Sequence, residues 1–135
     1  MKANDDMSKH LETAIIKIYG ESIDLVNLRD DDWGSESAST SSKKFGTPEI
    51  DAMRRDLTIN AMFYNINEGK VEDLTKMGID DMRQGLARTP LDPMITFTDD
   101  PLRIIRTVRF AQRFNLTISD EIKASAKTEE SINFF

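Results

Sequence analysis

The segment Asp99–Phe114 constrains the fold most strongly, because its apolar and charged residues recur with the spacing of an α-helix. We expect Thr98 to cap this helix, Pro101 to lie in its first turn and Asn115 to end it. The predicted apolar face comprises Ile104, Ile105, Val108 and Ala111. The predicted basic face spans roughly 120° and comprises Arg103, Arg106, Arg109 and Arg113. One face should therefore pack against a core, while the other presents guanidinium groups.

Two β-hairpins are predicted upstream of this helix. The segment Thr13–Leu28 is rich in β-branched residues and is interrupted at Gly20 and Glu21, which is typical of a hairpin. Further along, the strand-forming segments FYNI and KVEDL flank a turn at residues 67–69. The chain therefore combines short antiparallel strands with helices.

The remaining segments are predicted as follows. Residues 30–44 are acidic and serine-rich without periodicity, which favours a mobile loop or solvated linker. A helix is expected to begin at Thr47, before a proline and an acid, and to run to Met62. A short helical turn over Gly78–Arg83 and an extended segment over Leu86–Leu91 follow.

Composition limits the chemistry that the chain can carry. Its 135 residues fit one ordinary domain or parts of two, and 39% hydrophobic residues suffice for a modest core. With no cysteine and one histidine, the chain has no disulfide framework, thiolate nucleophile or Cys- or His-rich metal site. A metal bound here must use carboxylates, which favours Mg²⁺ or a related ion.

Charge and targeting signals narrow the class further. The net charge of −6 argues against non-specific binding of polyanions, but arginines cluster locally, so a polyanion site stays open. No apolar run approaches the ~20 residues that cross a bilayer, and the opening MKANDDMSKH resembles neither a signal nor a transit peptide. We expect an intracellular protein without a membrane partner, in the cytoplasm or alternatively the nucleus or mitochondrion.

The sequence RRDLTIN, which begins at Arg54, is the first candidate site. On a helix Arg55 shares a face with Thr58, and Asp56 shares a neighbouring face with Asn60. Asp56 and Asn60 can bond a ribose, and the two arginines can neutralise a triphosphate through bidentate bonds. A salt-bridged surface helix explains the same spacing, so both interpretations stay open.

The sequence DDPLR, at residues 99–103, is the second candidate site. Asp100 and Arg103 are three apart, so a local ion pair is one interpretation. The other interpretation concerns bases: cytosine and adenine present an amine donor beside a ring-nitrogen acceptor, whereas uracil and guanine present the reverse order. A fixed carboxylate beside a fixed guanidinium therefore selects C and A, at about 1 to 3 kcal/mol per contact.

Together these motifs are similar to those of class II tRNA nucleotidyltransferases, which include the CCA-adding enzymes, and of the related bacterial poly(A) polymerases. The resemblance is eukaryote-like and covers roughly residues 9–120. It rests on four segments in order: IDLVNLR at 23–29, FGTPEIDAMRRDLTINAMFYN at 45–65, VEDLT at 71–75 and RTPLDPMITFTDDPLRIIRTVRFAQRFNLTI at 88–118.

The resemblance implies an α+β fold, in which a partial nucleotidyltransferase head of β-hairpins and helices leads into the first helix of an all-helical neck. Residues 1–95 would be the C-terminal part of the head, and residues 96–135 the start of the RNA- and nucleotide-binding neck. The implied function is the addition of CCA to tRNA 3′ ends, with CTP, ATP and the tRNA 3′ end as partners.

The resemblance also implies roles for individual residues. Those expected to bind the nucleotide are Arg54, Arg55, Asp56, Asn60, Asp100, Arg103, Arg106 and Arg109. The RRD residues would recognise the ribose and phosphates, and Asp100 with Arg103 would serve as the protein template for the base. Arg106 and Arg109 would support the phosphates or their own helix.

The motifs that the family uses for catalysis are largely missing from this sequence. The family holds two Mg²⁺ ions and the triphosphate with a Gly-Gly-x-x-Arg-Asp loop and a strand bearing Asp-x-Asp, and residues 1–23 contain neither. Asp24 would be a catalytic carboxylate beside the metal and the one metal ligand kept. We therefore expect a fragment that is inactive alone. A non-catalytic nucleotide- or RNA-binding remnant, one part of a split enzyme, and a poly(A) polymerase are the alternatives.

Overall fold

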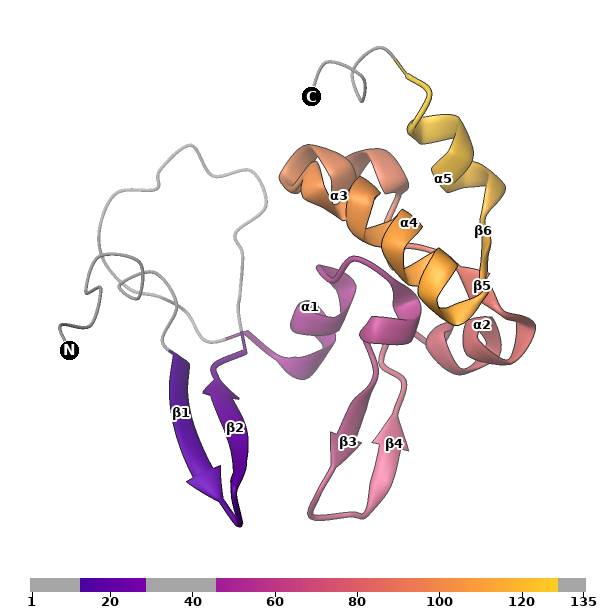
Figure 1. Ribbon diagram of the computed structural model, residues 1–135. Coiled ribbons are helices and arrows are strands. Elements are labelled where there is room, and N and C mark those ends of the chain that lie inside the picture. The colour runs from indigo at the N-terminus through magenta and orange to yellow at the C-terminus, as the bar shows by residue number, and fades with distance from the viewer. Residues whose placement is uncertain (1–12, 29–45, 129–135) are drawn as a thin grey trace, which may run out of the picture. The chain divides into compact units, whose positions relative to one another are not determined.

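The computed structural model describes residues 13–28 and 46–128 (Figure 1). The chain divides into two compact units, residues 1–47 and 48–135, and each is described by itself. The loop predicted at residues 30–44 lies outside the described residues.

The first unit contains an antiparallel hairpin of β1 (Thr13–Ile18) and β2 (Glu21–Val26). Its two-residue turn consists of Tyr19 and Gly20, which both have positive φ angles, 53° and 88°. Such a turn matches the twist of the two strands, and a glycine adopts it without a steric penalty. The first predicted hairpin is therefore confirmed, and every residue of both strands is exposed.

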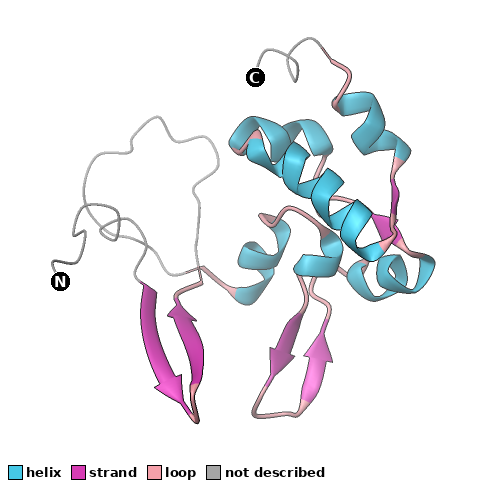
Figure 2. Ribbon diagram, viewed as in Figure 1, coloured by secondary structure: helices cyan, strands magenta, loops and turns pink. Residues whose placement is uncertain are grey.

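The second unit mixes helices with short strand pairs, as Figure 2 shows, and confirms the α+β class. Its elements are α1 (Pro48–Met53), η2 (Thr58–Asn60), β3 (Phe63–Asn65), β4 (Lys70–Glu72), α2 (Gly78–Gln84), β5 (Leu86–Ala87), α3 (Pro93–Asp99), α4 (Leu102–Phe114), β6 (Thr117–Ile118) and α5 (Asp120–Ser125). The antiparallel pair β3–β4 is the second predicted hairpin, and β5 pairs with β6 in parallel. The short helix predicted near Gly78 is α2.

The core of this unit is small and draws on many elements. Its buried members are Leu57, Ala87, Phe97, Ala111 and Ile122, which come from a loop, β5, α3, α4 and α5 respectively. Since no single element supplies more than one of these residues, each element is held mainly by its neighbours. The segment that follows α1 is thereby fixed against the helices near the C-terminus.

The helix predicted from Thr47 to Met62 ends at Met53, so the prediction was wrong for its second half. Leu57 is extended, with φ −132° and ψ 147°, and its side chain is fully buried in the core. The next amide, that of Thr58, donates to the carbonyl of Arg88 at 2.9 Å. Core burial and this long-range bond therefore outweigh continuation of the helix.

The helix predicted over Asp99–Phe114 is α4, which begins later than predicted, at Leu102, and has no side-chain cap. Thr98, the predicted cap, lies inside α3, a separate helix that was not predicted. Asp92 caps α3, because its side chain accepts from the amide of Met94 at 2.8 Å, with a proline at the first helical position. Asp100 separates the helices with φ −147° and ψ 101°. A residue before a proline disfavours the helical conformation, which explains the break. The predicted end at Asn115 is confirmed.

The two faces predicted for α4 are only partly correct. Ile105 and Val108 are 55% and 56% exposed, whereas Thr107 and Ala111 are buried. Thr107 can be buried because its hydroxyl donates to the carbonyl of Arg103 at 2.8 Å. The Arg103 side chain is itself only 12% exposed, so the predicted basic face is also divided.

Candidate functional site

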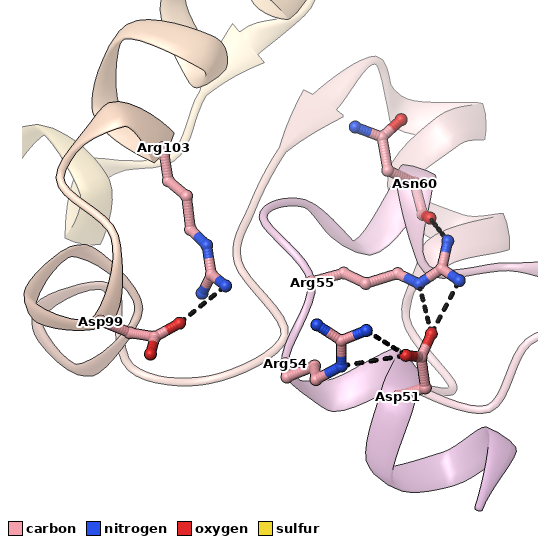
Figure 3. A network of polar contacts seen from close by, with 6 residues as sticks. All are labelled: Asp51, Arg54, Arg55, Asn60, Asp99 and Arg103. Atoms are coloured by element: carbon pink, nitrogen blue, oxygen red, sulfur yellow. Dashed lines mark hydrogen bonds and ion pairs between the residues drawn. The ribbon is translucent and has the colours of Figure 1, made fainter. Parts of the chain in front are cut away.

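A carboxylate near the end of α1 holds two consecutive arginines (Figure 3). Asp51 is 2% exposed. Its Oδ1 atom accepts from Nε of Arg54 at 2.9 Å and also from Nη2 of that residue. Its Oδ2 atom accepts from Nε and Nη2 of Arg55, at 3.0 and 2.8 Å. The two guanidinium groups therefore share one buried carboxylate.

Arg55 makes further contacts that fix its orientation. Its Nη1 atom donates to the carbonyl of Asn60 at 3.0 Å, and its guanidinium lies 4.7 Å from the ring centroid of Phe63. A guanidinium carries five N–H groups and three of them donate here, so two have no acceptor within the part of the chain that the structure describes. Arg55 and Thr58 do not share the face of one helix as predicted, because α1 ends at Met53 and the extended Leu57 separates Arg55 from η2.

Asp56 lies at the centre of a second set of contacts. Its Oδ1 atom accepts from the amide of Leu57 at 2.9 Å and from Nδ2 of Asn60 at 3.1 Å. Its Oδ2 atom contacts Nε and Nη2 of Arg106, at 2.8 and 2.7 Å. The predicted proximity of Asp56 and Asn60 is therefore found without the helix on which it was based.

The contact between Asp56 and Arg106 joins the first candidate site to α4. Asp56 belongs to the RRDLTIN segment, and Arg106 lies on α4, one turn after Arg103. Among the described residues, four donors surround the carboxylate of Asp56, which is the number that a carboxylate accepts. In this arrangement a ribose hydroxyl can bond to Asp56 only if Arg106 or Asn60 moves away.

Asp100 and Arg103, the residues predicted to select the base, each contact other partners. Nη2 of Arg103 contacts Oδ2 of Asp99 at 2.7 Å, and Nη1 donates to the carbonyl of Thr96 at 3.4 Å (Figure 3). Oδ1 of Asp100 accepts from the amide of Leu102 at 3.0 Å. The local ion pair of Arg103 is therefore made with Asp99, and the alternative of an ion pair with Asp100 was wrong. The extended backbone at Asp100 explains the difference.

Arg109 contacts an aromatic ring. Its guanidinium lies 5.3 Å from the ring centroid of Phe110, which also receives Arg106 at 5.5 Å. The rings of Phe110 and Phe114 are stacked, with centroids 6.0 Å apart. Within residues 13–28 and 46–128 no carboxylate pairs with Arg109, so its charge is not neutralised there.

Residues 2–88 match the Poly A polymerase head domain family. The chain belongs to this family. It is 53% identical over 121 residues to the mitochondrial CCA tRNA nucleotidyltransferase of Saccharomyces cerevisiae, covering 90% of this chain and 22% of that protein. It is 48% identical over 128 residues to the tRNA nucleotidyltransferase cca1 of Schizosaccharomyces pombe, covering 95% and 25%. It is 36% identical over 126 residues to poly(A) polymerase I of Salmonella typhi, covering 85% and 27%. The chain thus spans about a quarter of these relatives' length.

Solved structures of other proteins are similar to this chain. A tRNA-processing enzyme with CTP is 30% identical with a TM-score of 0.69, covering 90% of this chain and 29% of that chain. A tRNA nucleotidyltransferase complexed with a primer tRNA and an incoming ATP analog is 28% identical with a TM-score of 0.68, covering 90% and 32%. The fold described above therefore recurs in larger proteins.

One buried contact in this head domain chain was not predicted from the sequence. Asp81, fully buried on α2, accepts from the hydroxyl of Thr58 at 2.6 Å and from Nε and Nη2 of Arg88, at 3.1 and 2.7 Å. A Cβ atom at Gly78 would lie 2.6 Å from the carbonyl oxygen of Thr58, so only glycine fits. These contacts fix the segment that carries Asp56. No sequence spacing signals them, because they join separate elements.

Asp73 caps the start of α2. Its carboxylate accepts from the amide of Ile79 at 2.9 Å and from the hydroxyl of Thr75 at 2.8 Å. Burial opposes ionisation of this carboxyl, but hydrogen bonds from the Ile79 amide, the Thr75 hydroxyl and the amides of Gly78 and Met77 outweigh it and lower the pKa of Asp73. The helix start is therefore sensitive to acid.

Asp24, the predicted metal ligand, lies on β2 opposite Ile15 and is exposed. It belongs to the first unit, whereas the paired arginines belong to the second. Among residues 13–28 and 46–128 no three acidic or imidazole side chains gather in a way that could hold a metal ion.

Proposed function

We propose that this chain is part of a tRNA nucleotidyltransferase that adds C, C and A to tRNA 3′ ends from CTP and ATP. The relatives named as CCA tRNA nucleotidyltransferase and tRNA nucleotidyltransferase support this proposal. So do the solved relatives described with CTP, and with a primer tRNA and an ATP analog.

The contact between Asp56 and Arg106 carries the proposal, because it joins the RRDLTIN segment to α4, the helix that begins in the DDPLR segment and carries Arg103. Arg54, Arg55, Arg106 and Arg109 supply guanidinium groups for a triphosphate, which they can bind with bidentate bonds. Asp56 and Asn60 supply an acceptor and a donor for the ribose once Arg106 moves to the phosphates. The two motifs would then hold one nucleotide between them.

Selection of the base is assigned to Asp100 and Arg103. The guanidinium of Arg103 is oriented by Asp99 and by the carbonyl of Thr96, so its remaining N–H groups point in a fixed direction. Asp100 supplies the acceptor for an exocyclic amine. Together they match the pairing edges of cytosine and adenine and mismatch those of uracil and guanine.

The remaining assignments follow from the same family membership. Residues 1–95 are proposed as the end of the head and residues 96–135 as the start of the neck. Phosphoryl transfer would use Mg²⁺, which stabilises the attacking and leaving oxygens, and Asp24 would supply one of several carboxylates needed. No helix in the described part of the chain is long and apolar enough to cross a membrane. The compartment is proposed as the cytoplasm, with the nucleus or the mitochondrion as alternatives, and a relative named as mitochondrial supports the last of these.

The test is incorporation of CTP and ATP into a tRNA that lacks its CCA end. The chain is assayed alone and with a supplied segment bearing the Gly-Gly-x-x-Arg-Asp and Asp-x-Asp motifs. We expect incorporation only with that segment, ending after C, C and A. Nucleotide binding without incorporation in either case would identify a non-catalytic remnant instead. A long product from ATP alone would place the chain with the poly(A) polymerases, which the 36% identical relative represents.

A further inference from the structure

We infer that Asp51 is a positioning residue, whose carboxylate holds Arg54 and Arg55 side by side as one receptor for a triphosphate. The inference rests on the proposed function, in which both arginines bind phosphate. It adds a residue that contacts neither the base nor the ribose.

The carboxylate of Asp51 is shared between two arginines. Each oxygen of Asp51 accepts from a different arginine, and each arginine uses both Nε and Nη2. This side-on, two-pronged contact fixes the plane of a guanidinium as well as its position. These contacts hold the guanidinium of Arg55 in one orientation, and two of its five N–H groups have no acceptor among residues 13–28 and 46–128.

Electrostatics explains why the two arginines need such a partner. Arg54 and Arg55 are consecutive and partly buried, so their like charges repel and neither is fully hydrated. One shared carboxylate offsets part of this repulsion. Because the side chains are ordered before the ligand arrives, binding costs less conformational entropy.

The spacing was visible in the sequence. Asp51 is three and four positions before the arginines, which places all three on one side of a helical turn. The hydrogen bonds from both arginines satisfy this carboxylate in its buried position.

The test compares binding of tripolyphosphate, CTP and cytidine to the whole chain by calorimetry. The variants are Asp51→Asn, Asp51→Glu and, as a matched control, Asp80→Asn. Asp80 pairs with Arg83 at 3.3 Å on the exposed surface, so this control removes the same charge without touching the paired arginines. Circular dichroism checks that each variant is folded.

We expect Asp51→Asn to weaken binding of tripolyphosphate and CTP about tenfold and to leave cytidine binding unchanged. Asp51→Glu should recover part of the loss. The direction of the change in anion affinity distinguishes this role from a simple effect of charge. Removing a negative charge should by itself strengthen anion binding, and we expect a slight strengthening for Asp80→Asn. A purely structural role would weaken all three ligands together.

The inference is overturned if Asp51→Asn binds tripolyphosphate as tightly as the wild type, or if the wild type does not bind it. A second comparison applies if Asp51→Asn folds poorly. In a chain that already carries Arg54→Gln and Arg55→Gln, adding Asp51→Asn should have no further effect on tripolyphosphate binding. A further loss in that background would contradict the inference. Failure of the proposed function is seen separately, as a lack of CTP and ATP incorporation by the complemented chain.

Discussion

Arg106 contacts one oxygen of Asp56 through both Nε and Nη2, at 2.8 and 2.7 Å, although the two residues are 50 positions apart. Asp56 is buried and Arg106 is half-exposed. This ion pair connects the segment after α1 to α4, and we propose that both residues bind the nucleotide. Under that proposal, stability and ligand binding would compete for the same side chain.

The first prediction concerns the energy of this pair. A double-mutant cycle of Asp56→Asn and Arg106→Gln should give a coupling energy of about 1 kcal/mol in the free energy of unfolding by urea. The estimate is modest because Arg106 is partly hydrated. The exposed pair of Asp80 and Arg83 serves as the control, with coupling near zero. Equal coupling in the two cycles would contradict a special role for Asp56 and Arg106.

The second prediction concerns selection of the base. In the complemented enzyme, Arg103→Ala should reduce the preference for CTP and ATP over UTP and GTP about tenfold or more, since a good contact is worth about 1 to 3 kcal/mol. Affinity for the triphosphate should fall less. Kinetic comparison of the four nucleotides measures both effects, with Arg113→Ala on the same helix as the control. Full selectivity in the Arg103 variant would remove the base assignment.

The third prediction concerns the close contact at Gly78. Gly78→Ala should lower the free energy of unfolding by about 1 to 3 kcal/mol, because the added Cβ atom would lie 2.6 Å from the Thr58 carbonyl oxygen. Thr58→Val should also destabilise the chain, since it leaves the buried carboxylate of Asp81 without one donor. Urea unfolding measures both. Unchanged stability in Gly78→Ala would show that this backbone approach is not required.

The fourth prediction concerns acid. The pKa of Asp73 is lowered in the folded chain, so its carboxylate stabilises the fold above the ordinary value of 3.8, and this contribution is lost as the pH falls through the lowered pKa. Asp73→Asn should therefore lose stability relative to the wild type at pH 6, and the gap should narrow toward pH 3. A gap independent of pH would mean that ionisation of Asp73 does not stabilise α2.

The fold was predictable where local signals agree. Gly20 marks a two-residue turn and Asn115 a helix end, because only certain residues adopt positive φ cheaply. The predicted helix bounds were wrong at Leu57 and at Asp100, for different reasons. Leu57 leaves the helix to reach a core formed by residues distant in sequence, which no local pattern reports. Asp100 breaks the helix because of the proline after it, a local signal that was assigned to the first turn instead.

The contacts of the candidate site were likewise predictable only in part. The proximity of Asp56 to Asn60 follows from short sequence separation, and it is found even though the helix behind it is absent. The contact of Asp56 with Arg106 depends on how the second unit packs, so motif spacing could not give it. Asp99 is the ion-pair partner of Arg103, and their separation of four residues is a spacing that the sequence offered but the prediction passed over for Asp100.

The hairpin β1–β2 has a practical consequence. Within the described chain it pairs with no third strand, so both outer edges carry unpaired backbone amides and carbonyls, and Ile15 and Leu25 are 67% and 49% exposed. Open edges with apolar side chains template the addition of further strands. At the concentrations used for crystallisation, purified chains should therefore stack through this hairpin into oligomers, and a lysine at Ile15 should keep them in solution as separate molecules.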